Sequence, residues 1–163
     1  MKHLDTSKIT LASYSDEYIE GIRDYKLPPE QYLFTSYPLE ALEQVYQGCD
    51  KFPVLILNNG KAVGFFCLYS GKRVAEVTTN HRALLLTSFS VNYKYQKRGF
   101  AKQALYSISN FIKNHFEEID EVVLLVNMKN IPAQSLYINC GFKDMGERRM
   151  GKRGEQMVLH LKI

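Results

Sequence analysis

One strongly periodic segment in the second half of the chain constrains the fold more than any other feature. Between residues 101 and 116, apolar side chains recur at the three- and four-residue spacing of a single helix face. They are Ala101, Ala104, Leu105, Ile108, Phe111, Ile112 and Phe116. Apolar runs of strand length flank this segment at 83–91 and 121–126, and the second is typical of a strand buried on both faces. The pattern predicts a long helix between two strands of a covered sheet.

The rest of the chain predicts a hairpin and further elements. Two apolar runs, 52–58 and 62–70, flank Asn59-Gly60, a pair that supplies the positive backbone angles of a tight turn. We also expect a strand at 9–13, a helix from about Asp16 to before Pro28, a helix from Pro38 to Gly48, a short helix at 131–140 and strands near 142–150 and 156–163. This order indicates a mixed sheet with helices on its faces, in the α/β (α+β) class.

Composition and charge restrict the kind of protein. With 163 residues and 45% apolar residues, the chain matches a single globular domain over 1–163. The net charge of +4 suits both an enzyme that handles a phosphorylated ligand and a weak nucleic-acid binder. The basic residues are scattered, and no helix-turn-helix, zinc-finger or RNP pattern accompanies them, so we expect no nucleic-acid partner. Since the longest apolar runs fall far short of the roughly 20 residues that cross a bilayer, we expect no membrane span.

Cysteines and histidines suggest the compartment and argue against a metal site. The three cysteines, Cys49, Cys67 and Cys140, are widely spaced, and the first ten residues lack the apolar core of a signal peptide. We therefore expect a cytoplasmic protein with free thiols. The four histidines lie at metal-ligand spacing neither with one another nor with the cysteines, so we expect no metal.

A glycine in a basic loop directly precedes the predicted long helix. Gly99 follows Lys97 and Arg98, and Lys102 lies in the first helical turn. Free backbone N–H groups and the helix dipole favour anions at such a position, and glycine lets a ligand approach the backbone. The loop lacks both the nucleotide P-loop pattern and the dinucleotide-binding pattern. Taken alone, it is equally consistent with an ordinary loop that has a solvated basic face.

Two motifs stand on either side of the predicted long helix and the strand after it. The segment Gln96-Lys97-Arg98-Gly99-Phe100-Ala101 has the pattern Q/R-x-x-G-x-G/A. Downstream, the pattern N-x-x-A-x-x-L-Y followed by G-F is formed by Asn130, Ala133, Leu136, Tyr137, Gly141 and Phe142. In this order the two motifs resemble the signatures of the GCN5-related N-acetyltransferase (GNAT) superfamily, and in particular of its small bacterial members. The resemblance implies a mixed, mostly antiparallel sheet in which strands 83–91 and 121–126 splay apart.

The resemblance also implies acetyl-CoA as cosubstrate. In the family, loop N–H groups cradle the pyrophosphate, which assigns this role to the backbone of Gln96, Lys97, Arg98, Gly99, Phe100, Ala101 and Lys102. Phe89 and Val91 would line the pantetheine arm, and Asn130 would hold it from the other side. A backbone N–H near Phe89 or Val91 would polarise the thioester carbonyl.

The implied reaction is direct transfer of acetyl to an amine. Tyr137 occupies the family's position for the general acid that protonates the departing thiolate, although a core tyrosine is the alternative. Many members carry a carboxylate on the strand before the loop, whereas residues 84–91 of this chain offer only hydroxyl groups. The base is therefore ordered water or a carboxylate from elsewhere, with Glu30 and Glu76 as candidates that are otherwise surface residues.

The motifs leave the acceptor open. The resemblance implies a primary amine of a small molecule or peptide. A polyamine is one alternative, with Glu30, Glu40 and Glu43 as possible acidic contacts. A non-catalytic acyl-CoA-binding protein is the other, because the strand carboxylate is missing. A homodimer is compatible with all of these.

Overall fold

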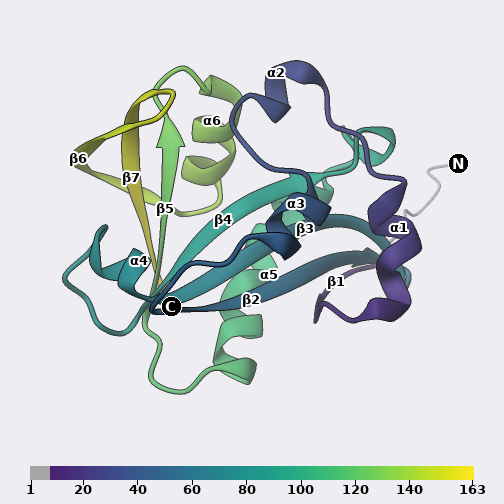
Figure 1. Cartoon of the computed structure of the whole chain (residues 1–163), viewed down its shortest axis with the longest axis horizontal. Coiled ribbons are helices and arrows are strands. Elements are labelled where there is room, and N and C mark those ends of the chain that lie inside the picture. The colour runs from purple at the N-terminus through teal and green to yellow at the C-terminus, as the bar shows by residue number, and fades with distance from the viewer. Residues whose placement is uncertain (1–7) are drawn as a thin grey trace, which may run out of the picture.

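The computed structural model describes residues 8–163 and is built around one seven-stranded sheet (Figure 1). The strand order is β1-β2-β3-β4-β5-β7-β6, and every neighbouring pair is antiparallel except β4 and β5. The strands are β1 (Ile9–Ser13), β2 (Cys49–Asn58), β3 (Lys61–Gly71), β4 (Ala83–Val91), β5 (Glu121–Asn127), β6 (Lys143–Gly151) and β7 (Gly154–Lys162). The mixed, mostly antiparallel α/β sheet predicted from the sequence is thus confirmed.

One long helix and several short ones cover the sheet. The long helix is α5 (Phe100–His115). The shorter ones are η1 (Asp16–Tyr18), α1 (Ile19–Arg23), α2 (Pro29–Tyr32), α3 (Pro38–Glu43), α4 (Lys72–Ala75), η2 (Tyr93–Tyr95) and α6 (Ile131–Asn139). In Figure 1, α3 lies in front of the sheet and α5 behind it, while α6 and α4 lie near opposite ends of β5. Among the helices within residues 8–163, none is long and apolar enough to cross a membrane.

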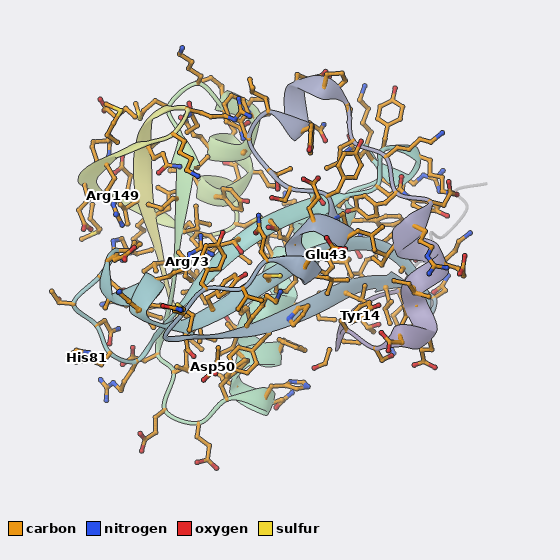
Figure 2. All side chains as sticks on the ribbon, viewed as in Figure 1. Tyr14, Glu43, Asp50, Arg73, His81 and Arg149 are labelled. Carbon is orange, nitrogen blue, oxygen red and sulfur yellow. The ribbon has the colours of Figure 1, made fainter. Side chains whose placement is uncertain are left out.

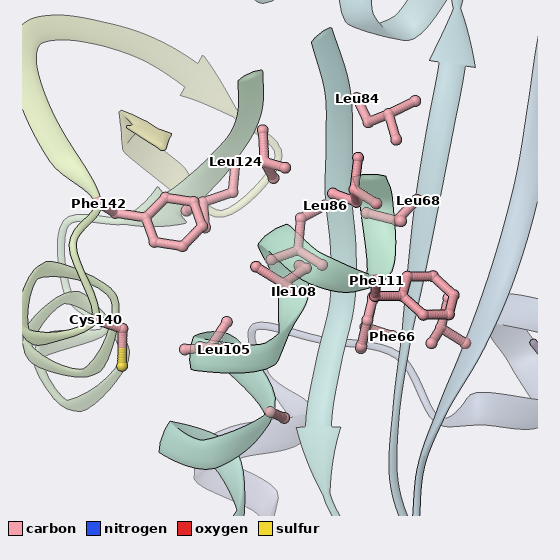
Figure 3. Close-up of a cluster of buried hydrophobic side chains, with 14 of the residues drawn as sticks. Phe66, Leu68, Leu84, Leu86, Leu105, Ile108, Phe111, Leu124, Cys140 and Phe142 are labelled. Atoms are coloured by element: carbon pink, nitrogen blue, oxygen red, sulfur yellow. The ribbon is translucent and has the colours of Figure 1, made fainter. Parts of the chain in front are cut away.

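Side chains that alternate along each central strand pack into two separate hydrophobic cores. Leu86 of β4 and Leu124 of β5 pack with Ile108 of α5 on one face (Figure 3). Leu85, the neighbour of Leu86, points to the other face and packs in the cluster that contains Ile22 of α1. This period-two alternation explains why the central strands are apolar throughout, as expected of strands buried on both faces.

The two clearest sequence predictions are confirmed. Asn59 and Gly60 adopt φ values of 50° and 82° between β2 and β3, as the hairpin turn requires. The helix expected from 101 to 116 is α5, and its buried side is formed by Phe100, Ala104, Leu105, Ile108, Phe111 and Ile112. Ala101 is half-buried, and Phe116 lies just beyond the helix end.

The first N-terminal helix is shorter than predicted. A 3₁₀ turn leads into α1, which ends at Arg23 instead of continuing toward Pro28. The reason lies in the next residues, because the Lys26 carbonyl accepts from the Tyr93 N–H (2.8 Å) and the Lys26 N–H donates to Asn92 Oδ1 (3.3 Å). These bonds replace helical ones and hold the segment against the end of β4.

The second N-terminal helix also ends early. Helix α3 stops at Glu43, five residues before Gly48, and Val45 is exposed. The Lys51 ammonium donates to the carbonyl oxygens of Ala41, Leu42 and Gln44 (2.9, 2.7 and 2.6 Å). A cation on the last carbonyl groups stabilises a helix end, so a side chain from β2 terminates α3. The sequence did not predict α2 or α4, each of which is a single turn.

The parallel pair β4–β5 separates part of the way along its length. Pairing runs from Ala83 with Glu121 to Leu86 with Leu124. Beyond that point β4 bulges at Ser88, whose φ is 54°, and its register with β3 shifts there. β5 instead follows β7 as far as Asn127. The two strands therefore diverge, as the resemblance implied.

Candidate active site

The loop between η2 and α5 has a backbone shaped for an anion. Lys97 and Gly99 both have left-handed φ values, 63° and 79°, and Gly99 is the N-cap of α5. A Cβ built on Gly99 would meet no protein atom closer than Gln103 Nε2 at 3.8 Å. The backbone angle favours glycine here, and the space beside it is open to a ligand. Left-handed residues in such a turn direct successive N–H groups toward one point.

These N–H groups are free to bind an anion. Within residues 8–163, none of the backbone N–H groups from Lys97 to Lys102 donates to a protein acceptor. The first helical bond is made by the Gln103 N–H to the Gly99 carbonyl at 3.1 Å. Six consecutive unpaired donors, three before and three within the first turn of a sixteen-residue helix, could bind an anion, and the positive end of the helix dipole would favour it.

The basic side chains around the loop are exposed and uncommitted. Lys97, Arg98 and Lys102 form no ion pair in the described part of the chain. The Arg98 guanidinium lies 5.8 Å from the centre of the Tyr95 ring, and the Lys102 ammonium lies 5.8 Å from that of Tyr106. These three cations make the surface around the loop positively charged.

Gln96, the first residue of the signature, directs its side chain back into the protein. Its Nε2 donates to the Val91 carbonyl (2.8 Å) and to Gln31 Oε1 (2.7 Å), and its Oε1 accepts from Gln31 Nε2 (3.0 Å). The carboxamide is therefore hydrogen-bonded to the end of β4 and to α2. It holds the loop in place. The Gln96 N–H is also committed, because it donates to the Tyr93 carbonyl at 3.2 Å, so the prediction that this N–H helps to bind the pyrophosphate is wrong and the free donors begin at Lys97.

Phe89 and Val91, predicted to line the pantetheine arm, lie on β4, and Phe100, predicted to bind the pyrophosphate through its backbone, begins α5. The side chains of Val91 and Phe100 are 7% and 2% exposed, so each can offer a ligand only its backbone. Phe89 is half-buried, and its ring lies 5.8 Å from that of Phe66 and 6.1 Å from that of Tyr137.

The second signature forms helix α6 beside the diverging strands. Asn130 is the N-cap of α6, and its Oδ1 accepts from the Ala133 N–H at 3.4 Å. Its amide nitrogen has no acceptor within residues 8–163 and is free to bind a ligand. The Tyr137 ring packs edge-on against Phe89 of β4 and against Phe142 (5.6 Å). A side chain of α6 thus reaches β4 across the opening between the strands.

The Tyr137 hydroxyl is the least satisfied polar group at this site. The hydroxyl oxygen makes no hydrogen bond to any described residue. It is not fully buried, so it retains contact with solvent. Burial of the ring raises the pKa of Tyr137 above its usual value. The phenol therefore stays protonated throughout the neutral range and has a proton to donate.

The two candidate carboxylates lie in different places. Glu30 is exposed in the first turn of α2, the helix joined to the loop through Gln31. Glu76 follows α4, near the end of β5 remote from α6 (Figure 1). Its carbonyl accepts from the Arg149 guanidinium at 2.7 Å, and Figure 2 shows Arg149 at the β6 side of the molecule. The structure thus brings the loop, Phe89, Val91 and Tyr137 together but leaves Glu76 apart.

Glu76 instead lines a separate groove of ≈ 680 Å³ between the α4–β4 connection and β6–β7. None of the residues predicted to bind the coenzyme lines this groove. It therefore does not belong to the site formed by the loop and α6.

Sequence reasoning missed three polar contacts that fix the N-terminal segment to β4 and to the loop after it. Asn92 is 1% exposed, and its Nδ2 donates to the Asp24 carbonyl at 3.0 Å. The Tyr25 hydroxyl and Ser90 Oγ, both buried, form a 2.7 Å hydrogen bond. The third is made by Gln31, as described above. The signal for Asn92 and Ser90 was present, because polar residues that end an apolar strand need partners when they are buried.

Comparison with known proteins agrees with this geometry. Residues 19–142 match the family described as "Acetyltransferase (GNAT) family". The "uncharacterized N-acetyltransferase YbbJ" of Bacillus subtilis (strain 168) is 38% identical over 156 residues, which cover 95% of this chain and 98% of that protein.

Solved structures show the same fold at low sequence identity. The aminoglycoside acetyltransferase AAC(6')-Ib in complex with acetyl-CoA and parmomycin has a TM-score of 0.71 at 13% identity, covering 94% of this chain and 93% of that one. A spermidine N-acetyltransferase SpeG chimera from Vibrio cholerae and hSSAT has a TM-score of 0.63 at 15% identity, covering 94% and 95%. Together with the match over residues 19–142, these findings show that the chain belongs to the GNAT acetyltransferase family.

Proposed function

We propose that the protein is an acetyl-CoA-dependent N-acetyltransferase that acts on a primary amine of a small molecule or peptide. The observation that carries the proposal is the run of six free N–H groups from Lys97 to Lys102, placed where β4 and β5 diverge. Membership of the GNAT family and the acetyl-CoA complex of AAC(6')-Ib support the choice of coenzyme.

The residues present fit acetyl-CoA. The N–H groups of the loop would donate hydrogen bonds to the pyrophosphate oxygens, and Lys97, Arg98 and Lys102 would balance the negative charge. The pantetheine arm would lie along the free edge of β4 beside Phe89 and Val91, with the Asn130 amide on its other side. When bound, the coenzyme supplies an acetyl thioester, and a β4 backbone N–H would polarise its carbonyl.

The acceptor must lose a proton for the reaction to proceed. The pKa of an alkylammonium, about 10.4, lies about 3.4 units above pH 7. Deprotonation at that pH therefore costs roughly 4.6 kcal/mol. Because β4 carries no carboxylate, we assign proton removal to ordered water or to Glu30 on α2. The amine nitrogen would then bond to the acetyl carbon and release its second proton to water as the carbon–sulfur bond breaks. The Tyr137 hydroxyl would donate a proton to the departing sulfur and regain one from solvent.

The first test is coenzyme binding. Acetyl-CoA at a hundred times its dissociation constant should add about 2.7 kcal/mol to the free energy of unfolding, which corresponds to a rise in Tm of roughly 5–10 °C for a chain of this size. Gly99→Glu should abolish the rise, because it places bulk and negative charge where the pyrophosphate lies. No rise in the wild type at saturating acetyl-CoA contradicts the proposal.

The second test separates an enzyme from an acyl-CoA-binding protein, the alternative favoured by the absence of a carboxylate on β4. Release of free coenzyme thiol should be followed with polyamines, amino acids, aminoglycosides and lysine peptides. Release with any amine supports catalysis, and preference for polyamines would point to the acidic residues near α2 and α3. Silence across the panel, with binding intact, favours the non-catalytic alternative.

A further inference from the structure

An N-terminal segment, residues 24–31, is fastened to the strand and loop that form the coenzyme site. The Tyr93 N–H donates to the Lys26 carbonyl (2.8 Å), and the Lys94 ammonium pairs with the Asp24 carboxylate (2.9 Å). Tyr25–Ser90 and Asn92–Asp24 add two further hydrogen bonds. The segment and residues 90–96 therefore form one connected unit, although about 65 residues of sequence separate them.

Helix α2 lies at the far end of this segment and is held less securely. It is a single turn that begins at Pro29, and none of its residues is buried. Its amides bond back to nearby carbonyls, as in Tyr32 N–H to Pro28 (2.9 Å) and Leu33 N–H to Pro29 (3.0 Å). A single exposed turn is marginal without tertiary contacts. Its position thus depends on side chains that reach other elements.

Gln31 provides the contact between α2 and the coenzyme loop. Its carboxamide and that of Gln96 exchange two hydrogen bonds, 2.7 and 3.0 Å long. The second Nε2 proton of Gln96 goes to the Val91 carbonyl at 2.8 Å. One continuous path therefore runs from α2 through Gln31 and Gln96 to the end of β4. Gln96 is also the residue directly before the free N–H groups.

We infer that Gln31 is a positioning residue that transmits coenzyme binding to α2. The inference rests on the proposed function, in which an anion fixes the backbone of the loop. Fixing the loop immobilises Gln96, and Gln96 then restrains Gln31 and α2. Since Glu30 lies on the same turn, the acceptor side becomes ordered when the coenzyme is bound. An acceptor that binds after the coenzyme does not have to supply the free energy that orders α2. Binding of the coenzyme and binding of the acceptor are therefore positively coupled.

Hydrogen exchange with coenzyme A as the probe tests this inference without knowledge of the acceptor. The amides to follow are those of residues 31–34, which bond back to Pro28, Pro29 and Gln31. The two carboxamide hydrogen bonds are formed without ligand, and fixing the loop should make them open less often. In the wild type, saturating coenzyme A should therefore slow exchange at these amides about ten-fold. In Gln31→Met the slowing should fall below about two-fold, while protection of residues 97–103 persists.

A matched control and a double variant make the test specific. Gln47 is exposed and forms no hydrogen bond to any residue within 8–163, so Gln47→Met should behave as the wild type. Gln31→Met combined with Gln96→Met should weaken coenzyme binding no more than Gln96→Met alone, since both remove the same contact.

The outcomes separate the inference from the proposed function. Protection of residues 97–103 with equal slowing at 31–34 in the wild type and in Gln31→Met overturns the coupling alone. Additive effects of the two substitutions on coenzyme affinity also overturn it. Absence of any protection at 97–103 in the wild type overturns the coenzyme site and the coupling together.

Discussion

Replacement of Tyr137 by phenylalanine separates chemistry from folding unusually well. The substitution removes one oxygen that has no hydrogen-bond partner within residues 8–163, while the ring keeps its contacts with Phe89 and Phe142. The free energy of unfolding should therefore change by less than about 0.5 kcal/mol, or about 1–2 °C in Tm. If the hydroxyl is the general acid, kcat should fall about 100-fold or more, which corresponds to about 2.7 kcal/mol in the activation free energy.

The assay combines release of free thiol, with an amine identified in the panel above, and calorimetric titration with coenzyme A. Affinity for coenzyme A should stay within about two-fold, because the removed hydroxyl acts on the departing sulfur. Tyr106→Phe is the matched control, since Tyr106 lies on α5 and is 57% exposed. A kcat for Tyr137→Phe within two-fold of the wild type refutes the acid role. A loss of more than about 1 kcal/mol in stability shows instead that the hydroxyl supports the fold.

Three further results are expected. Gly99→Ala should lower the free energy of unfolding by about 1 kcal/mol, because residue 99 has a left-handed φ, and thermal unfolding tests this. Gly99→Glu should weaken coenzyme A binding at least ten-fold more than Gly99→Ala, as measured by calorimetry. Equal affinities of the two variants would refute close approach of the pyrophosphate. Asn92→Ala should cost about 1–3 kcal/mol in urea unfolding, because it leaves the Asp24 carbonyl and the Lys26 N–H without their partner, and a loss below 0.5 kcal/mol would contradict this. Burial raises the pKa of the Cys67 thiol and of Tyr69 to about 12, above their unfolded values of 9.0 and 10.0. The unfolded chain therefore loses these protons first, so these two groups should leave Tm steady from neutral pH to about pH 9 and lower it as the pH rises from 9 to 12. A flat profile between pH 9 and 12 would contradict the raised values.

Local patterns predicted the fold where sequence and packing agree. The Asn59-Gly60 turn and helix α5 followed from backbone preference and apolar spacing, which the structure satisfies together. The N-terminal helices were predicted too long, because their ends depend on distant groups. Lys51 of β2 terminates α3, and Asn92 draws Lys26 away from α1. Asn92 lies 66 residues from Lys26 in the sequence. Lys51 lies only 7 to 10 residues from its partners, but its contact with them depends on the path of the chain from α3 into β2.

The candidate site also contains parts that the sequence predicted and parts that it did not. The loop around Gly99 and the helix that carries Tyr137 were predicted from the resemblance of two motifs to a family, and the structure places the loop at the start of α5 and Tyr137 on α6, with their site roles still a prediction. Gln31 was not found, since an exposed glutamine gives no local signal and its partner Gln96 lies 65 residues away. The role of Gln96 was placed in its backbone, and the structure adds a structural role for its side chain.

The short ladder between β4 and β5 has a mechanical consequence. It divides the sheet into a leaf of four strands and a leaf of three, joined along Ala83–Leu86 and Glu121–Leu124. Widening the leaves beyond Leu86 breaks no β4–β5 ladder hydrogen bond, and contacts such as Phe89–Tyr137 are the ones that span that part. The two parts of the sheet can therefore separate most easily beyond Leu86 and Leu124. A ligand of greater or lesser thickness is accommodated there by the movement of side chains.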